Sequence, residues 1–322
     1  MNKRKTLELE KIIHDDYSNI AGIIIKKNND MVFEKYFNNF KKSDTIHIAS
    51  VTKSILSILI GIAIDKAYIE STEQKILDFF PKYILKKREK TIQNVTIRHL
   101  LTMTAPYKFK SEPYTKVYSS DDWTKSVLDL LGGKTLSGDF KYTTIGLQVL
   151  SGILVNATGQ SILDFASENL FSPLGIISPN NLRIRNKEEH LSFLKDKYVN
   201  GWVIDPKSIN TAGWGLTLTT RDMAKIGQLY LNKGKWNNNQ IVSSKWIKES
   251  TKKHSHLNDL AYGYLWWIID SQENNCFSAI GDGGNIIYIN RLKNIIIAIT
   301  SQFMPRAKDR IELIQKHIIP NL

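Results

Sequence analysis

The segment from His47 to Ile64 reads HIASVTKSILSILIGIAI, and we interpret the rest of the chain outward from it. Ser50 and Lys53 are three residues apart, which places a hydroxyl and an amine on one face of a helix. Backbone amides at a helix N-terminus favour negative charge that develops beside them. The residues after Lys53 are nearly all apolar, so we expect the pair at the dry end of a buried helix. A lysine in a dry site can lose its proton and accept one from a serine.

The Ser-x-x-Lys spacing is not specific by itself, because it occurs three times in the chain. Its commoner interpretation is a helix end with a solvated lysine. Ser192–Lys195 and Ser250–Lys253 lie among charged residues, as expected of a solvated surface, whereas Ser50 alone begins a long apolar run. We therefore predict that Ser50 and Lys53 carry the chemistry.

Composition limits the classes of protein that remain. The chain has 322 residues, of which 42% are hydrophobic, enough for one large domain or two closely packed lobes. Its formal net charge of +13 is spread along the sequence without a zinc-finger spacing or an RNA-binding motif, so we expect no nucleic-acid binding. Cys276 is the only cysteine, which excludes an intrachain disulfide and a cysteine-based metal cluster.

The N-terminal residues are basic, but segment 6–17 is mostly polar or charged and does not form the apolar core of a signal peptide. The apolar run Ser54–Ile64 is shorter than the roughly 18 residues that a membrane span needs. We therefore expect a protein without a membrane span, cytoplasmic unless a leader has been removed.

Strand patterns occur near both ends of the chain and predict one sheet built from both. A helix over Thr6–Tyr17 precedes a hairpin of Ile20–Lys26 and Met31–Phe37. Four more strands and a last helix are predicted near the C-terminus: Tyr262–Ile269, Cys276–Ile280, Asn285–Asn290, Asn294–Thr300 and Lys308–Ile318.

Helical patterns dominate residues 71–205, which we interpret as an all-helical lobe inserted into an α/β lobe formed by residues 1–70 and 206–322. The predicted fold class is therefore α/β (α+β), with an antiparallel sheet flanked by N- and C-terminal helices. The helices predicted between the two groups of strands are Thr96–Met103, Ser120–Leu131, Thr143–Ala157, Ser161–Leu170, Thr219–Leu231 and Ser243–Ser250.

Two more segments accompany the serine helix: Tyr142-Thr143-Thr144, which opens a buried helix, and Gly281-Asp282-Gly283-Gly284, which joins two strands. In this order the three segments resemble the motifs of the serine β-lactamase and penicillin-binding-protein superfamily, namely Ser-x-x-Lys, Tyr-x-Asn or Tyr-x-Ser, and a Lys-Thr-Gly-like strand. Segments 97–104, 213–216, 220–227, 262–267 and 277–284 are similar to the branch that contains class C β-lactamases, esterases and 6-aminohexanoate-dimer hydrolases. The resemblance implies a β-lactamase/transpeptidase-like fold with the active site in the cleft between the lobes.

The resemblance also implies a role for each motif. Ser50 is the acylated nucleophile, and Lys53 accepts its proton directly or through Tyr142. Tyr142 carries the proton to the leaving group and later helps to activate the deacylating water. A charged Lys53 beside a Tyr142 phenolate is the alternative. The oxyanion hole takes the Ser50 amide and one more from Gly281–Gly284; the alignment favours that of Gly284, with Asp282 as the alternative.

Two positions depart from the pattern of the family. Thr144 stands where Asn or Ser is usual, so a carboxamide that binds a substrate amide is lost. Gly281 stands where penicillin-recognising members carry Lys or His, and Asp282 adds a negative charge beside it. Because a like charge opposes a substrate carboxylate, we expect neutral or amine-bearing esters or amides rather than penicillins.

The other aromatic and basic residues have structural interpretations. We expect His99 to pack or bond within the helical lobe, and His254-Ser255-His256 to form a polar surface loop. Trp266 and Trp267 are expected on opposite faces of one strand, one of them in the core.

We therefore predict a serine hydrolase, an esterase or amidase that forms an acyl-enzyme with a small-molecule or peptide substrate. We expect neither a metal nor an organic cofactor. A D,D-carboxypeptidase or weak β-lactamase is the alternative enzyme, and a non-catalytic binding module is the alternative of another class. The absence of Gly-x-Ser-x-Gly argues against a Ser-His-Asp hydrolase of the lipase type.

Overall fold

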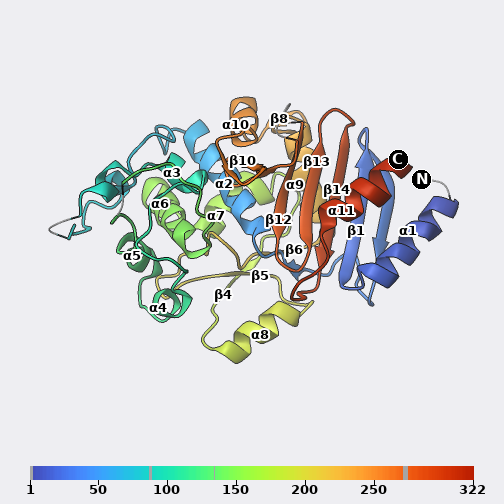
Figure 1. Ribbon diagram of the computed structural model, residues 1–322, viewed down its shortest axis with the longest axis horizontal. Helices are drawn as coiled ribbons and strands as arrows, with labels where there is room; N and C mark the ends of the chain where they lie inside the picture. The colour runs from blue at the N-terminus through green and yellow to red at the C-terminus, as the bar shows by residue number, and fades with distance from the viewer. Residues whose placement is uncertain (1–2, 87–88, 134, 271–274) are drawn as a thin grey trace.

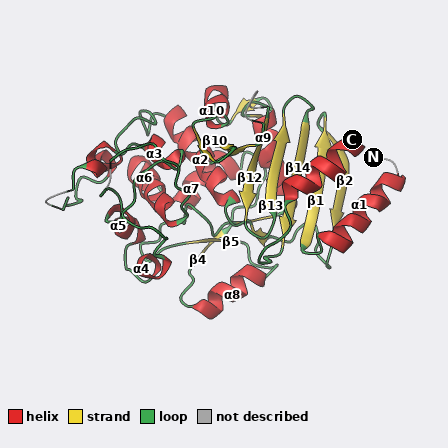
Figure 2. Cartoon of the chain, in the orientation of Figure 1, coloured by secondary structure: helices red, strands yellow, loops and turns green. Residues whose placement is uncertain are grey.

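The computed structural model describes residues 3–86, 89–133, 135–270 and 275–322. Its centre is an eight-stranded antiparallel sheet in the order β2-β1-β14-β13-β12-β11-β10-β9 (Figures 1 and 2). The N-terminal strands β1 (Ile20–Lys27) and β2 (Asp30–Tyr36) join the sheet through β14 (Ile295–Ser301). Both ends of the chain therefore build one sheet, which confirms the predicted α/β architecture.

The central strands are rich in isoleucine because helices cover the sheet on both faces. Successive side chains of a strand point to opposite faces. Ile23 and Ile25 pack in the cluster beneath α1 (Lys3–Asp16) and α11 (Arg310–Leu313), which cross one face in Figure 1. Ile24 belongs to the other cluster, with residues of α2 (Val51–Asp65) and α9 (Thr220–Leu231). The continuous apolar run of β1 therefore contributes side chains to the hydrophobic cores on both faces of the sheet.

The remaining elements are short. The sheet also contains β9 (Ser255–Leu257), β10 (Leu260–Tyr262), β11 (Trp267–Ile268), β12 (Cys276–Gly281) and β13 (Asn285–Asn290). Three two-stranded pairs are β3 (Ile46–His47) with β6 (Thr217–Leu218), β4 (Asn180–Leu182) with β5 (Gly201–Val203), and β7 (Lys235–Trp236) with β8 (Asn239–Gln240). The other helices are α3 (Ile97–Leu101), α4 (Tyr114–Tyr118), α5 (Trp123–Leu128), α6 (Gln148–Thr158), α7 (Ile162–Ala166), α8 (Lys187–Lys195) and α10 (Ser244–Ser250).

The lobe predicted to be all-helical contains a small parallel pair, β4 with β5. Each strand has only three residues, too few for a period-two pattern to stand out in the sequence. The buried helix predicted over Thr143–Ala157 begins with a 3-10 turn at Ile145–Leu147 and continues as α6. Gly159 ends α6 in the left-handed conformation, with a φ of 69°.

The strand predicted over Tyr262–Ile269 is a hairpin instead. Leu265 has a φ of 62°, and Gly263 N donates to Trp266 O at 2.8 Å, so the chain reverses between β10 and β11. Trp266 is fully buried in the core, whereas Trp267 is half-buried and faces the cleft. The predicted division between the two tryptophans therefore holds, although a turn rather than a continuous strand produces it.

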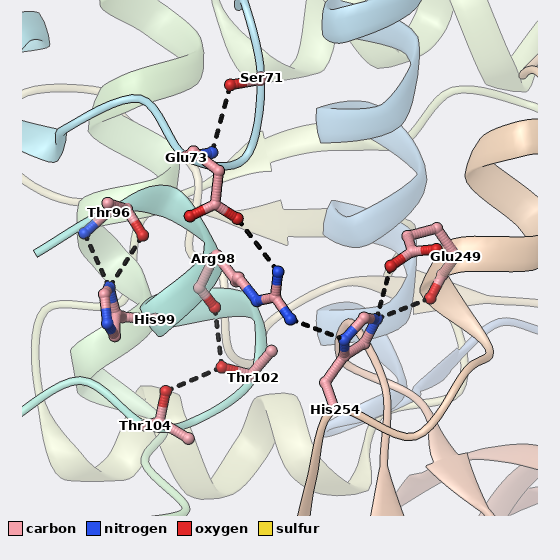
Figure 3. A network of polar contacts seen from close by, with 9 residues as sticks. All are labelled: Ser71, Glu73, Thr96, Arg98, His99, Thr102, Thr104, Glu249 and His254. Carbon is pink, nitrogen blue, oxygen red and sulfur yellow. Dashed lines mark hydrogen bonds and ion pairs between the residues drawn. The ribbon is translucent and has the colours of Figure 1, made fainter. Parts of the chain in front are cut away.

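A polar network joins the helical lobe to the sheet lobe (Figure 3). Arg98 of α3 donates to Glu73 Oε1 at 3.1 Å and to His254 Nδ1 at 3.4 Å. His254 Nε2 donates to Glu249 O at 2.9 Å, and its ring stacks on Tyr264 with centroids 4.2 Å apart. Burial lowers the pKa of His254, which favours this neutral tautomer. The prediction of a surface loop at His254 was wrong, because the sequence does not show its stacking partner.

None of the described helices, taken singly, combines the length and the apolar composition that a bilayer span requires. The bent pair Ile145–Thr158 and Ile162–Phe171, at 78° to each other, meets the two criteria only when taken together.

Candidate active site

The serine helix begins as the sequence predicted. Ser50 immediately precedes α2, whose residues from Val51 to Ala63 are all buried. Ala49 has a φ of 49°, a left-handed conformation that costs about 1–2 kcal/mol in a residue with a Cβ atom. The amide of Ser50 donates no hydrogen bond to any of the described residues, since the turn bonds here start at Val51 N. A strained residue therefore directly precedes a serine whose backbone N–H is unpaired.

Lys53 is held against Ser50 in a dry position. Its side chain is 1% exposed, and Nζ lies 2.7 Å from Ser50 Oγ. The other contacts of Nζ are Gly213 O at 2.8 Å and Thr144 Oγ1 at 3.3 Å. Within the described parts of the chain Lys53 forms no ion pair with a carboxylate. Three oxygen atoms thus fix the amine beside the serine hydroxyl, and none of them carries a formal charge.

Gly213 is required for this arrangement. A Cβ atom on Gly213 would lie 2.5 Å from Thr144 O, which is backbone and does not move aside easily. A glycine therefore lets the 213 carbonyl reach Lys53 while the Thr144 backbone packs against it.

The structure places Tyr142 and Thr144 at the same site. Lys53 Nζ lies 4.9 Å from the centroid of the Tyr142 ring, and that ring stacks on Trp267 with centroids 5.8 Å apart. Among the described residues, no hydrogen bond joins the Tyr142 hydroxyl to Ser50 or Lys53. Tyr142, which was predicted to share the proton with Lys53, therefore contacts Lys53 with its ring and not with its hydroxyl group.

Glu112 and Tyr114 belong to the site and were missed from the sequence. Oε1 of Glu112 accepts from Thr144 N at 2.7 Å, from Ile145 N at 2.9 Å and from the Thr143 hydroxyl. The Tyr114 hydroxyl donates to Oε2 of Glu112 at 2.5 Å. A carboxylate at a helix N-terminus is favourable. Glu112, however, lies 31 residues before Thr143, the first residue that it contacts there, so no local pattern could reveal the contact.

Tyr114 lines the cavity, remains 45% exposed, and donates its hydroxyl hydrogen to Glu112. Burial raises its pKa, and the hydrogen bond to Glu112 raises it further. The oxygen therefore stays a hydrogen-bond donor at neutral pH, beside Thr144 and within the cavity that contains Ser50.

Gly281 forms the opposite wall of the site. A Cβ atom at this position would lie 2.3 Å from Ile48 O and 3.1 Å from Ser50 N. Strand β12 therefore packs backbone to backbone against the start of α2. No side chain fits between these two backbones in this chain, so position 281 offers only its main chain to the site.

The turn 281–285 decides which amide is available to the substrate. The amide of Gly284, which the alignment favoured, donates to Gly281 O at 3.2 Å, and Gly284 packs against Arg310 outside the cavity beside Ser50. The alignment-based preference for Gly284 is therefore corrected. The amide of Asp282 donates to none of the described residues, and Asp282 lines the cavity together with Ser50. Gly283 lies in the turn with a φ of 79° and does not line that cavity.

The cavity beside Ser50 has a volume of about 770 Å³, the size of a small-molecule site. Among the described residues that line it, the charged ones are all acidic, namely Glu112, Asp282 and Asp309. The chain as a whole has 44 Lys and Arg against 31 Asp and Glu, so the cavity is opposite in charge to the protein around it. Its apolar wall is formed by Leu257, Leu260, Trp267, Ile269, Ile280 and Ile311.

Across the residues that the structure describes, no group of three or more His, Cys, Asp or Glu side chains is arranged to hold a metal ion.

The fold and the motif residues now define the class of protein. The family model for beta-lactamase matches residues 19–318, so the chain belongs to the beta-lactamase family. It is 20% identical over 308 residues to 6-aminohexanoate-dimer hydrolase of Paenarthrobacter ureafaciens, covering 87% of this chain and 72% of that protein. The family model and this relative support a hydrolase of the serine β-lactamase and penicillin-binding-protein superfamily, so the resemblance seen in the sequence is confirmed.

Solved structures agree on the fold. The penicillin binding protein from Bacillus halodurans superposes with a TM-score of 0.72 at 19% identity, covering 95% of this chain and 98% of that one. A family VIII carboxylesterase superposes with a TM-score of 0.69 at 14% identity, covering 94% of this chain and 92% of that one.

Proposed function

We propose that the protein hydrolyses a neutral or amine-bearing ester or amide through an acyl-enzyme on Ser50. The observation that carries the proposal is the 2.7 Å contact between Ser50 Oγ and the buried Lys53 Nζ, at the mouth of a cavity of about 770 Å³. A serine hydroxyl becomes a nucleophile when an adjacent base accepts its proton.

In the acylation step, Ser50 Oγ forms a bond to the substrate carbonyl carbon and its proton passes to Lys53 Nζ. Negative charge develops on the carbonyl oxygen, and we assign the amides of Ser50 and Asp282 as its donors, because both amides are unpaired among the described residues and both residues line the same cavity. The bond to the leaving group then breaks, and the leaving oxygen or nitrogen takes the proton from Lys53. In the deacylation step, water gives a proton to Lys53 and attacks the acyl carbon, the bond to Ser50 Oγ breaks, Ser50 takes the proton back from Lys53, and the carboxylic acid is released.

The direct route through Lys53 is supported by its contact with Ser50. Tyr142 enters as the second proton carrier of the proposal, because its ring is next to Lys53. A modest rotation of the Tyr142 side chain would be needed to bring its hydroxyl to the leaving group, so its part is assigned to substrate-bound states.

The acidic cavity supports the substrate class. A substrate carboxylate would meet Glu112, Asp282 and Asp309, and like charges oppose binding, whereas an ammonium group would be attracted. The apolar wall fits a hydrocarbon chain. The 6-aminohexanoate-dimer hydrolase relative acts, by its name, on a dimer of an amino acid, which carries both an amine and a carboxylate, so it supports the amine part of the proposal and not the discrimination against a carboxylate.

Intact-mass labelling with a fluorophosphonate tests the proposal. We expect one adduct on wild-type protein, no adduct on Ser50→Ala, and unchanged labelling of Ser250→Ala, the matched serine of another Ser-x-x-Lys segment. Short esters or amides should be hydrolysed by wild-type protein and by Ser250→Ala, and not by Ser50→Ala. A folded wild-type protein that forms no adduct and hydrolyses none of these compounds would favour a non-catalytic binding module. Efficient turnover of a cephalosporin would contradict the proposed substrate class.

A further inference from the structure

The turn between β12 and β13 is fixed by hydrogen bonds to its carbonyl groups. All four of its carbonyl groups accept hydrogen bonds: Gly281 O from Gly284 N at 3.2 Å, Asp282 O from Asn285 Nδ2 at 3.0 Å, Gly283 O from Asn19 Nδ2 at 2.7 Å, and Gly284 O from Ser301 Oγ at 3.1 Å. Three of the four donors are side chains from other parts of the chain or from the next strand. Such a turn has little freedom to rotate its peptide groups.

These supporting side chains are buried and connected to each other by Arg310. Asn19 is 6% exposed and Ser301 is 1% exposed. Arg310 Nη2 donates to Asn19 Oδ1 at 2.6 Å and to Ser301 Oγ at 3.3 Å, and Nη1 donates to Lys308 O at 2.8 Å. A Cβ atom on Gly284 would lie 2.6 Å from Arg310 Cζ, so the guanidinium lies directly behind the turn.

Arg310 is buried without a carboxylate partner among the residues described here. Burial lowers its pKa to about 10, which shows that the environment disfavours the charge. Buried charges are normally paired, because removing an ion from water is costly. Apart from Lys308 O and the Tyr17 ring, 5.1 Å away, the contacts of the guanidinium are the two side chains that hold the carbonyls of Gly283 and Gly284. Its position is therefore explained by the turn rather than by an ion pair.

We propose that Asn19 and Arg310 are positioning residues that hold the Asp282 amide toward the substrate carbonyl oxygen. With the carbonyls of the turn held by these bonds, the amide of Asp282, a residue that lines the cavity, is left unpaired among the described residues and can donate to a substrate oxygen. Donors that are oriented before the reaction stabilise the oxyanion without reorganisation. This inference rests on the proposed function, because it requires an oxyanion at Ser50.

The test compares Asn19→Ala and Arg310→Gln with a matched control, Arg291→Gln. Arg291 is a half-buried arginine near the sheet, bonded to Thr251 Oγ1 at 2.8 Å and placed 4.6 Å from the Phe277 ring, away from the turn. The probes are p-nitrophenyl acetate, for kcat and KM, and phenylboronic acid, whose tetrahedral adduct on a serine presents an oxygen to the oxyanion hole.

We expect kcat for Asn19→Ala and Arg310→Gln to fall about 10- to 100-fold, somewhat less than for complete loss of one donor. KM should stay within about twofold, and the inhibition constant of phenylboronic acid should rise in proportion to the loss of kcat. Arg310→Lys, which keeps one donor for Asn19, should recover part of kcat and part of the affinity for phenylboronic acid. Arg291→Gln should leave kcat and the inhibition constant of phenylboronic acid unchanged. If Asn19→Ala does not fold, Ser301→Ala removes a single bond to the turn and should show the same pattern at smaller size.

Two results would overturn the inference alone: wild-type protein that is labelled on Ser50 while Asn19→Ala keeps its kcat, or a loss of kcat without any change in boronate inhibition. A wild-type protein that is neither labelled nor active would instead overturn the proposed function, and this inference with it.

Discussion

The two sides of the cleft present different kinds of chemical group to one cavity. On the helical side, side chains from separate segments meet: Lys53, Tyr142, Thr144 and Glu112 are connected by contacts between side chains or from a side chain to backbone. On the sheet side, the group offered is a backbone amide, and its neighbour Gly281 is there because it has no side chain. Side chains therefore supply the groups beside Lys53, whereas backbone geometry supplies the proposed oxyanion donor.

The largest effect should come from the amine of the helical side. Lys53→Met should slow fluorophosphonate labelling of Ser50 about 10³-fold, within the range that a positioned acid or base contributes. Lys253→Met, an exposed lysine with the same spacing from a serine, is the control and should label at the wild-type rate. Equal labelling rates for Lys53→Met and wild type would show that the side-chain wall does not activate the nucleophile.

The sheet side should respond to a single methyl group. Gly281→Ala places a Cβ atom 2.3 Å from Ile48 O, so β12 or the start of α2 must shift. We expect kcat/KM for p-nitrophenyl acetate to fall about 10²-fold, as when one oxyanion donor is lost. Ser278→Ala on the same strand serves as the control and should keep its activity. Wild-type activity in a folded Gly281→Ala protein would disprove the close backbone packing.

Glu112 tests whether the helical side depends on a carboxylate distant in sequence. Glu112→Gln removes the charge that accepts from Thr144 N and Ile145 N. Hydrogen bonds to charged groups contribute about 1.5–3 kcal/mol, so thermal unfolding should shift downward and kcat/KM should fall about tenfold. Asp122→Asn, which changes a carboxylate cap on α5, should affect stability only slightly and activity not at all. A Glu112→Gln protein with unchanged kinetics would remove Glu112 from the site.

The smallest effect concerns Asp282, the residue whose side chain the turn between β12 and β13 adds to the cavity. Asp282→Asn keeps the amide and removes the charge, so the preference for an ammonium-bearing ester over a matched carboxylate-bearing ester should weaken about three- to tenfold. Competition assays with the two p-nitrophenyl esters measure this ratio. Asp259→Asn, an exposed residue in the turn between β9 and β10, should not change it. An unaltered ratio for Asp282→Asn would assign the specificity to other groups.

The difference between the two walls also explains what the sequence predicted. The apolar run after Lys53 and the strands at both chain ends follow from local periodicity, and the family motifs locate Ser50, Lys53, Tyr142 and Thr144. Glu112 could not be found, because the backbone amides that it accepts from, Thr144 N and Ile145 N, lie more than 30 residues away and no local pattern connects them to it.

The sheet side was predicted less well, for a physical reason. An amide is present at every residue other than proline, so residue type could not distinguish Asp282 from Gly284. Only the hydrogen bond from Gly284 N to Gly281 O separates them. The hairpin at Leu265 was missed similarly, because its positive φ is not encoded by a glycine or asparagine.

Trapping the acyl-enzyme tests the central claim most directly. Wild-type protein mixed with p-nitrophenyl acetate is quenched in acid within the first turnover, and the tryptic peptide of residues 43–53 is then examined by fragmentation mass spectrometry. We predict a single acetyl group on Ser50 that disappears on longer incubation and is absent from Ser50→Ala. Hydrolysis by wild-type protein with no acetyl group on Ser50, or with the acetyl group on another residue, would contradict the account.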